Sequence, residues 1–226
     1  MSPLNQFMHL GLIIPSSNTV MEDELSLYVT VHSTRVSLKN VDEESLKKMN
    51  QELSKAVDLI SDCHPDAIVY GCTSGSFIED VDNILKKSVI PSVTTSHAVV
   101  SALQTLGAKT VSVATPYIDK INLKEKAFLE SKGFTIKDIK GLGLLNNIEI
   151  GRKEPEAAYN LAKSLKKADV IFISCTNFKT FDFIYDLEDE LKTPVVSSNS
   201  ASLWGAYKAA NKKEKIYLGT LLEEHL

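Results

Sequence analysis

The sequence predicts an α/β protein made of two similar lobes, each folded around a parallel β-sheet. Short apolar runs alternate along the chain with longer amphipathic stretches, which is typical of repeated strand and helix units. One half of the chain also repeats the strand and turn pattern of the other half. Of the 226 residues, 43% are hydrophobic and 24% are charged, which is the balance of a globular protein.

Short apolar runs separated by turn residues and amphipathic stretches predict the strands. The expected strands are His9–Ile14, Thr30–Leu38, Ala67–Tyr70, Ser92–Thr94, Thr110–Ala114, Thr135–Leu142, Val170–Ser174, Val195–Ser198 and Ile216–Leu218.

Helices are expected in the gaps between these strands. The clearest starts after Asp42, a residue type that caps helix N-termini, and continues to Ile60. Its apolar residues follow steps of three and four, so that one stripe faces the sheet: Leu46, Met49, Leu53, Val57 and Ile60. A second clear helix starts at about Pro155, because proline suits the first helical turn.

The internal repeat is the most informative feature of the sequence. Asp66–Thr73 aligns with Asp169–Thr176 at an offset of 103 residues, and Pro91–Ala98 aligns with the segment at 194–201 at the same offset. A further match joins the segment at 12–16 to the segment at 113–117, at an offset of 101 residues.

The repeat divides the chain into two lobes of similar design. We expect residues 1–97 and 211–226 to form the first lobe and residues 98–210 to form the second. The last segment would then cross back from the second lobe to the first.

Charge and hydropathy exclude several classes of partner. The net charge is −4 and Arg35 and Arg152 are the only arginines, whereas a nucleic-acid-binding protein would present a basic, arginine-bearing face. No apolar run is long enough to span a bilayer, and no Lys or Arg precedes the apolar stretch at 10–14 as in a signal peptide. We therefore expect a cytoplasmic protein with no membrane or nucleic-acid partner.

The chain has three cysteines, Cys63, Cys72 and Cys175, an odd number that does not favour a disulfide framework. Their spacing fits no zinc pattern, and we expect neither a metal nor a cofactor. Cys72 and Cys175 occupy equivalent repeat positions, each directly after a predicted buried strand, where ligands bind in open α/β sheets. We expect these two thiols to face each other across a cleft between the lobes.

Two opposed thiols can act on both faces of a planar, carbanion-like carbon, one attacking or giving a proton while the other sits opposite. Each cysteine precedes a predicted helix, so we expect a thiol pKa below the ordinary ~8.5. Donors in Thr73–Ser76 and Thr176–Asn177 could cradle a carboxylate and a developing enediolate. The alternatives are that both cysteines are small core residues and that Ser74 and Ser76 only cap a helix.

Five stretches of the sequence together match the motifs of a known enzyme family. They are Gly11–Asn18, Cys72–Phe77, Ala114–Asp119, Ser174–Asn177 and Pro194–Ala201. On these motifs nearly the whole chain resembles the arylmalonate decarboxylase and maleate cis-trans isomerase family of the aspartate/glutamate racemase superfamily. The resemblance implies two pseudo-symmetric Rossmann-like lobes with parallel four-stranded sheets, an aspartate/glutamate racemase-like fold, and a homo-oligomer, either dimer or tetramer.

The two cysteine positions separate activities within this family. Maleate isomerases and racemases carry both cysteines, whereas proteins similar to arylmalonate decarboxylase carry glycine at the first. By resemblance to maleate isomerase, Cys72 would add as a thiolate to C2 of maleate and give a succinyl-cysteine adduct that rotates freely. Cys175 would protonate the adjacent carbon and later take that proton back, releasing fumarate. The residues expected to hold the small dicarboxylate substrate are Asn18, Ser17, Thr73, Ser74, Tyr117, Thr176 and Asn177.

Other interpretations stay open at this point. The patterns at Thr73–Phe77 and 175–182 look closer to the decarboxylase, so a decarboxylase or a racemase acting by cysteine proton transfer is an alternative function. A non-catalytic protein that binds a small acid is a third. Tyr117 could instead be a core tyrosine, and Arg35 is better interpreted as part of a salt bridge than as a substrate ligand. Cys63, at the end of a long helix, is expected to be structural.

Overall fold

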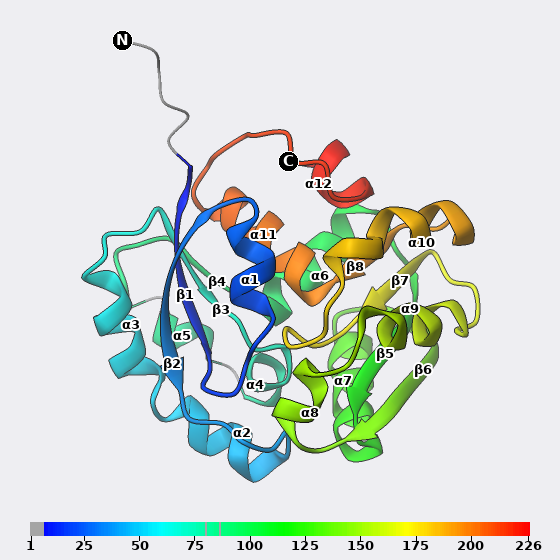
Figure 1. Cartoon of the computed structure of the whole chain (residues 1–226), viewed down its shortest axis with the longest axis horizontal. Coiled ribbons are helices and arrows are strands. Elements are labelled where there is room, and N and C mark those ends of the chain that lie inside the picture. Colours follow the sequence, from blue (N-terminus) through cyan, green and yellow to red (C-terminus); the bar gives the residue numbers. More distant parts are fainter. Residues whose placement is uncertain (1–6, 80, 86) are drawn as a thin grey trace.

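The computed structural model describes residues 7–79, 81–85 and 87–226, and its strands form two separate parallel sheets of four strands each (Figure 1). The first sheet has the order β2-β1-β3-β4, with β1 (His9–Pro15), β2 (Thr30–Val36), β3 (Ala67–Tyr70) and β4 (Ser92–Thr94). The second has the order β6-β5-β7-β8, with β5 (Thr110–Tyr117), β6 (Thr135–Leu144), β7 (Val170–Ile173) and β8 (Val195–Ser197). The predicted fold class is therefore confirmed.

The two sheets place the cysteines at equivalent points. Strands β3 and β7 are apolar runs buried at every residue, as expected for central parallel strands covered on both faces. β1 pairs with β3 as far as Ile13 and Tyr70, and β5 pairs with β7 as far as Ala114 and Ile173. Each catalytic candidate, Cys72 or Cys175, thus lies two residues beyond the last pair of its sheet.

Helices connect the strands and cover both sheets. They are α1 (Met21–Ser26), α2 (Glu43–Asn50), α3 (Leu53–Ser61), α4 (Thr73–Ile78), α5 (Asp82–Leu85), α6 (Thr95–Thr105), α7 (Asp119–Ser131), α8 (Asn147–Gly151), α9 (Pro155–Lys163), α10 (Ile184–Leu191), α11 (Ser198–Ala209) and α12 (Thr220–Glu224), with a 3₁₀ turn at Phe181–Phe183. Helix α9 begins at Pro155 as predicted. None of the helices in the described part of the chain combines the length and apolarity that a membrane crossing needs.

Helices α6 and α11 pack against each other near the centre of the molecule, between the two sheets (Figure 1). Helix α11 also contacts β3, β4 and β8, and its residues from Ser198 to Tyr207 are all buried. The close approach depends on Gly205, where a Cβ atom would lie 2.8 Å from the Cβ atom of Ala98. The helix that follows the last strand of the second sheet therefore also covers the first sheet.

The helix expected from Asp42 to Ile60 is wrong in one respect, since it is two helices, α2 and α3, separated by a turn. Asp42 does cap α2, and its carboxylate accepts a hydrogen bond from the Ser45 amide (2.9 Å). The break follows Asn50, whose side chain is drawn into the core, where it donates to the Gly75 carbonyl (3.0 Å). That buried amide fixes the end of α2, while the apolar stripe continues along α3.

The strand expected at Ile216–Leu218 is also wrong, because these residues pair with no strand among the residues described. Ile216 and Leu218 are buried while Tyr217 is 63% exposed. Burial therefore alternates along the segment as it does in a strand, although the segment joins neither sheet. The chain after α11 contacts both halves, since Lys212 pairs with Asp66 (3.0 Å) and Thr220 donates to Glu188 (2.9 Å). The lobe boundaries at 97/98 and 210/211 stay a prediction.

Candidate active site

The predicted site residues lie at the carboxyl ends of the central strands, where the connections from neighbouring strands leave in opposite directions and ligands bind in open α/β sheets. In the first sheet they follow β1 and β3, and in the second they end β5 or follow β7. None of them is more than 8% exposed: Ser17, Asn18, Cys72, Thr73, Ser74, Tyr117, Cys175, Thr176 and Asn177. The site is therefore closed around its own polar groups.

One hydroxyl joins the two cysteine segments. The Thr73 hydroxyl donates to Ser198 Oγ (2.8 Å), and Ser198 Oγ accepts the backbone N–H of Cys175 (3.0 Å). Thr73 follows Cys72 directly, and Ser198 is the first residue of the central helix α11. The two cysteine segments are thus joined through the Ser198 side chain.

A second bridge joins the loop after β1 to the loop after β7. The Asn18 amide donates to the Thr176 hydroxyl (3.1 Å), which in turn donates to the Gly71 carbonyl (3.0 Å). The side-chain oxygen of Asn18, Oδ1, accepts the N–H groups of Val20 and Met21 (both 3.0 Å) at the start of α1. Asn18 therefore keeps at most one N–H for a ligand.

Ser17 and Asn177 form a third bridge, with Asn147 of α8. Asn177 accepts the Thr19 N–H (2.8 Å), and its amide donates to the Asn147 and Ser17 carbonyls (2.6 and 3.4 Å). The Ser17 hydroxyl donates to the Leu38 carbonyl (2.5 Å) and accepts from the Asn147 amide (2.8 Å). These two predicted substrate ligands thus use their side-chain donors within the protein.

Cys72 is the N-cap of α4. Its Sγ atom accepts the Gly75 N–H (3.3 Å) and lies 3.8 Å from Ser74 Oγ. The Tyr70 hydroxyl also interacts with this thiol, but its proton is donated to Asn50 Oδ1 (2.7 Å). The Gly75 N–H and the Ser74 hydroxyl are therefore the groups that can donate to a Cys72 thiolate.

Cys175 has a different backbone setting, and the helix expected directly after it is absent. The chain turns instead, and helix α10 begins only at Ile184. Cys175 has a positive φ of 103°, an unfavourable conformation for a residue with a Cβ atom. Its Sγ atom accepts the Asn177 N–H (3.4 Å), and the Tyr117 hydroxyl also bonds to the thiol.

Burial raises the pKa of both thiols, which corrects the expectation of lowered values. It raises the pKa of Cys72 despite the contacts with Gly75, Ser74 and Tyr70. Burial is also the main reason that the pKa of Cys175 is raised to about 12, a value to which charges on Cys72 and Glu125 contribute and which Tyr117 and Asn177 oppose. Removal from water disfavours a thiolate more than a few hydrogen bonds favour it, so both groups are thiols at neutral pH.

A family model described as arylmalonate decarboxylase matches residues 10–220, nearly the whole chain. The chain belongs to the arylmalonate decarboxylase family. A maleate isomerase of Geobacillus stearothermophilus is 26% identical over 231 residues, covering 90% of this chain and 92% of that protein. An arylmalonate decarboxylase of Bordetella bronchiseptica is 31% identical over 141 residues, covering 60% of this chain and 59% of that protein.

Solved structures of the family show the same fold. A cysteine-to-serine variant of Nocardia farcinica maleate cis-trans isomerase, with a covalently bound succinylcysteine intermediate, superposes with a TM-score of 0.90 at 26% identity. The match covers 97% of this chain and 99% of that one.

The structure adds three residues to the candidate site that the sequence argument missed. Ser198 bridges the cysteine segments, Tyr70 contacts Cys72, and Glu125 of α7 accepts the Ser174 hydroxyl (2.5 Å). A signal existed for each. Ser198 lies within the second repeat, Tyr70 ends a buried strand two residues before a cysteine, and Glu125 falls on the buried side of its helix.

Two residues considered on sequence grounds lie outside the site. The salt-bridge interpretation of Arg35 is confirmed, since it pairs with Glu22 (2.5 Å) with both side chains partly exposed. Arg35 also donates to the backbone carbonyl of Asn18 (2.8 Å) and so stabilises the loop after β1. Cys63, expected to be structural, is exposed on the turn after α3 and does not pack in the core.

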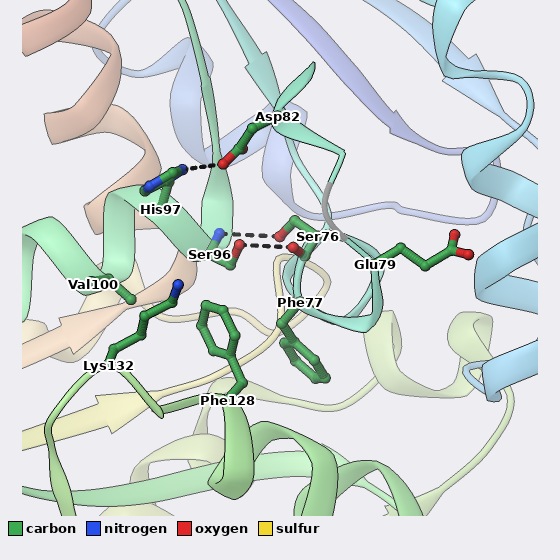
Figure 2. Close-up of a pocket in the computed structure, with 9 residues that line it drawn as sticks. All are labelled: Ser76, Phe77, Glu79, Asp82, Ser96, His97, Val100, Phe128 and Lys132. Carbon is green, nitrogen blue, oxygen red and sulfur yellow. Dashed lines mark hydrogen bonds and ion pairs between the residues drawn. The ribbon is translucent and has the colours of Figure 1, made fainter. Parts of the chain in front are cut away.

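A cavity of about 270 Å³ is lined by residues of α4, α6 and α7 (Figure 2). Ser76 of α4 is tied there to Ser96 of α6, because Ser76 Oγ accepts the Ser96 N–H (3.1 Å). His97 and Asp82 form an ion pair across its upper edge (2.6 Å). The lining residues are Ser76, Phe77, Glu79, Asp82, Ser96, His97, Val100, Phe128 and Lys132, and neither site cysteine is among them.

Proposed function

We propose that this protein is a cofactor-independent isomerase of a small cis-dicarboxylate that converts maleate to fumarate. The observation that carries the proposal is the pair of buried, repeat-related cysteines, whose strand ends are joined through Ser198. Relatives named maleate isomerase that match about nine-tenths of the chain support the choice of substrate.

The proposed reaction begins when Cys72 releases its proton to water and, as a thiolate, adds to C2 of the double bond. The sulfur electron pair forms the S–C bond, and the π electrons move toward C3 and its carboxylate. Cys175 gives its proton to C3, so the former double bond becomes a single bond and rotates. The Cys175 thiolate then takes a proton from C3, the double bond re-forms, and the S–C bond breaks to release fumarate.

The surroundings of the two cysteines suit these separate tasks. Burial raises the pKa of Cys175 to about 12, so that it carries a proton to give at neutral pH. Cys72 has donors that favour its charged form, from Gly75 and Ser74. Ser17, Thr73 and Asn177 spend their side-chain donors on the protein itself. We therefore assign the substrate carboxylates to three other groups, Asn18, Ser74 and Tyr117, and Thr176 acts through Asn18.

Decarboxylation of an arylmalonate by proton transfer from Cys175 is the second candidate. The 31% identity to an arylmalonate decarboxylase favours it. The decarboxylase-like pattern at 175–182 supports this candidate less strongly, because Thr180 is already used within the protein. The Thr180 hydroxyl donates to Ser197 Oγ (3.0 Å), and the Thr180 backbone N–H donates to Glu24 (2.5 Å).

Proton NMR in D₂O tests the proposal, with maleate, phenylmalonate and aspartate in parallel tubes. We expect the fumarate singlet to appear with maleate and to be lost in Cys72→Ser and in Cys175→Ser. The matched control is Cys63→Ser, which changes the exposed cysteine and should convert maleate at the wild-type rate. Loss of CO₂ from phenylmalonate or exchange of an α-proton of aspartate, with maleate unchanged, would refute the substrate but not the two-thiol site.

Mass spectrometry distinguishes covalent catalysis from proton shuttling. We expect Cys175→Ser incubated with maleate to accumulate an adduct of one whole maleate on Cys72. Water protonates C3 slowly in place of Cys175, and the adduct persists because the base that would remove that proton is gone. Absence of any adduct while wild-type protein makes fumarate would contradict the nucleophilic role of Cys72. Binding of small acids that survives both serine variants, with no turnover in any tube, would instead indicate a non-catalytic binding protein.

A further inference from the structure

Glu125 is a buried acid that the proposed reaction does not use. Its side chain projects from α7 into the core and the residue is only 1% exposed, which is rare for a glutamate. One carboxyl oxygen, Oε1, accepts the Ser174 hydroxyl at 2.5 Å. The other, Oε2, is buried and has no hydrogen-bond partner among the described residues.

The contacts of Glu125 lead directly to the second cysteine. Ser174 immediately precedes Cys175, and the Ser174 N–H donates to the Ala114 carbonyl (2.8 Å) at the end of the second sheet. The hydrogen bond to Glu125 thus holds the side chain of the residue directly after β7. Cys175 follows in its positive-φ conformation, which persists only if its neighbours are fixed.

Helix α7 also supports the other residue beside the Cys175 thiol. The Asn122 amide donates to the Tyr117 carbonyl (3.3 Å), and Asn122 Oδ1 accepts the Thr115 hydroxyl (2.5 Å). The Thr115 hydroxyl oxygen accepts the Tyr117 N–H (3.1 Å). One helix therefore presents two buried polar residues, Asn122 beneath Tyr117 and Glu125 beneath Cys175.

We infer that Glu125 is a positioning residue for Cys175, which acts through Ser174 and must be uncharged for Cys175 to give up its proton. The inference rests on the proposed function, in which Cys175 becomes a thiolate during each turnover. A neutral carboxyl holds Ser174 without opposing that thiolate. A negative charge at Glu125 would repel it in a dry interior, where charges interact strongly.

The groups that face Glu125 make such a charge costly. Burial raises the pKa of Glu125 to about 8. The hydrogen bond from the Ser174 hydroxyl acts in the opposite direction but is weaker than the effect of burial. The titratable groups coupled to Glu125 are Cys175 after β7 and Tyr117 at the end of β5. From the other elements packed on α7, helix α4 brings no titratable side chain in Thr73–Ile78. Those of β6 are Lys137, Asp138 and Lys140, of which Asp138 and Lys140 pair with each other and Lys137 is exposed.

The test compares pH profiles of maleate turnover, each normalised to its own maximum. In the wild type we expect kcat to fall above pH ~8, at most about tenfold per pH unit, as Glu125 ionises. In Glu125→Gln, which keeps the shape but cannot ionise, that fall should move to higher pH. The matched control is Glu130→Gln, an exposed acid on the same helix, whose profile should follow the wild type. Identical profiles for Glu125→Gln and wild type would overturn the inference.

A second variant separates position from charge. Ser174→Ala removes the hydroxyl that links Glu125 to the cysteine segment. We expect kcat to fall with little change in KM, because Cys175 is displaced while the carboxylate ligands remain. The fall of kcat at alkaline pH should persist, since Glu125 is still present. An unchanged kcat would contradict the role of Ser174 as the link.

Two measurements without substrate keep this inference apart from the proposed reaction. Infrared difference spectra should show a protonated carboxyl band that is lost above pH ~8 in the wild type and is missing from Glu125→Gln. In a Cys63→Ser, Cys72→Ser background, the ultraviolet absorbance of the remaining thiolate should appear at lower pH when Glu125 is also replaced by Gln. If maleate is not converted but this thiolate shifts, the coupling stands and the substrate is wrong. If the thiolate does not shift, the inference fails whatever the substrate.

Discussion

Replacing Glu125 by glutamine should also change how the stability of the protein depends on pH. Burial raises the pKa of Glu125 from an ordinary 4.5 to about 8 in the folded state. Below the lower value the carboxyl is protonated in both the folded and the unfolded chain, so this group does not make the free energy of unfolding depend on pH. Between the two values the unfolded chain releases the proton while the folded chain keeps it, and stability is therefore lost as pH rises.

The size of the effect follows from the shift. Each pKa unit corresponds to ~1.4 kcal/mol, so the free energy of unfolding should fall by about 5 kcal/mol through this group between pH ~4.5 and pH ~8. Glutamine has no such titration, and burying its amide adds an offset that does not depend on pH. Glu24, whose pKa is also raised by burial, contributes the same slope to both proteins and cancels in the difference.

Urea unfolding at a series of pH values measures this difference. The single tryptophan, Trp204, is buried and gives a fluorescence signal, and a reducing agent keeps the three cysteines as thiols. We expect Glu125→Gln to gain stability relative to wild type steadily from pH ~5 to pH ~8 and no further above pH ~9. Glu130→Gln serves as the exposed control. A difference between variant and wild type that stays constant over this range would refute the assignment of a neutral, buried Glu125.

Three further predictions concern packing and the thiols. Gly205→Ala should destabilise the protein by about 1–3 kcal/mol in urea unfolding, because the new Cβ atom would lie 2.8 Å from the Cβ atom of Ala98. Adding Ala98→Gly to this variant should restore much of the lost stability. In the native protein a thiol reagent should modify exposed Cys63 at once and the two buried cysteines only slowly; three fast-reacting thiols would contradict the closed site. Ser74→Ala should slow alkylation of Cys72 further, since it removes a hydroxyl beside the thiolate, and an unchanged rate would show that this contact does not matter.

The sequence was sufficient to predict the fold because the signals are local or repeated. Four-residue apolar runs at 67–70 and 170–173 are the strands β3 and β7, and the repeat correctly predicts two equivalent sheets. Asp42 and Pro155 mark helix starts because capping and proline geometry involve only neighbouring residues. The extra strand at Ile216–Leu218 was wrong because alternation of burial says nothing about whether a partner strand is available.

The site was harder to predict because its properties come from contacts between distant residues. The repeat indicated that Cys72 and Cys175 are equivalent, and the structure does bring their segments together through Ser198. The direction of the thiol pKa values was predicted wrongly, since local donors were visible in the sequence but full burial was not. The bond from Ser174 to Glu125 spans 49 residues and has no sequence signal beyond the buried side of a helix. The homo-oligomeric state and the cytoplasmic location stay predictions.

The pseudo-symmetry of the fold supplies two thiols, and departures from that symmetry suit them to different tasks. Cys72 caps a helix and receives donors from its own segment, whereas Cys175 has positive φ, a tyrosine beside it and a buried acid behind it. Paired titratable groups in unlike environments are how one site provides both members of an acid–base pair. In the proposed reaction the Cys72 thiolate must form first, and the donors Gly75 and Ser74 favour it. Exchanging the roles would require Cys175 to be the thiolate before it has given its proton to C3, although burial raises its pKa to about 12.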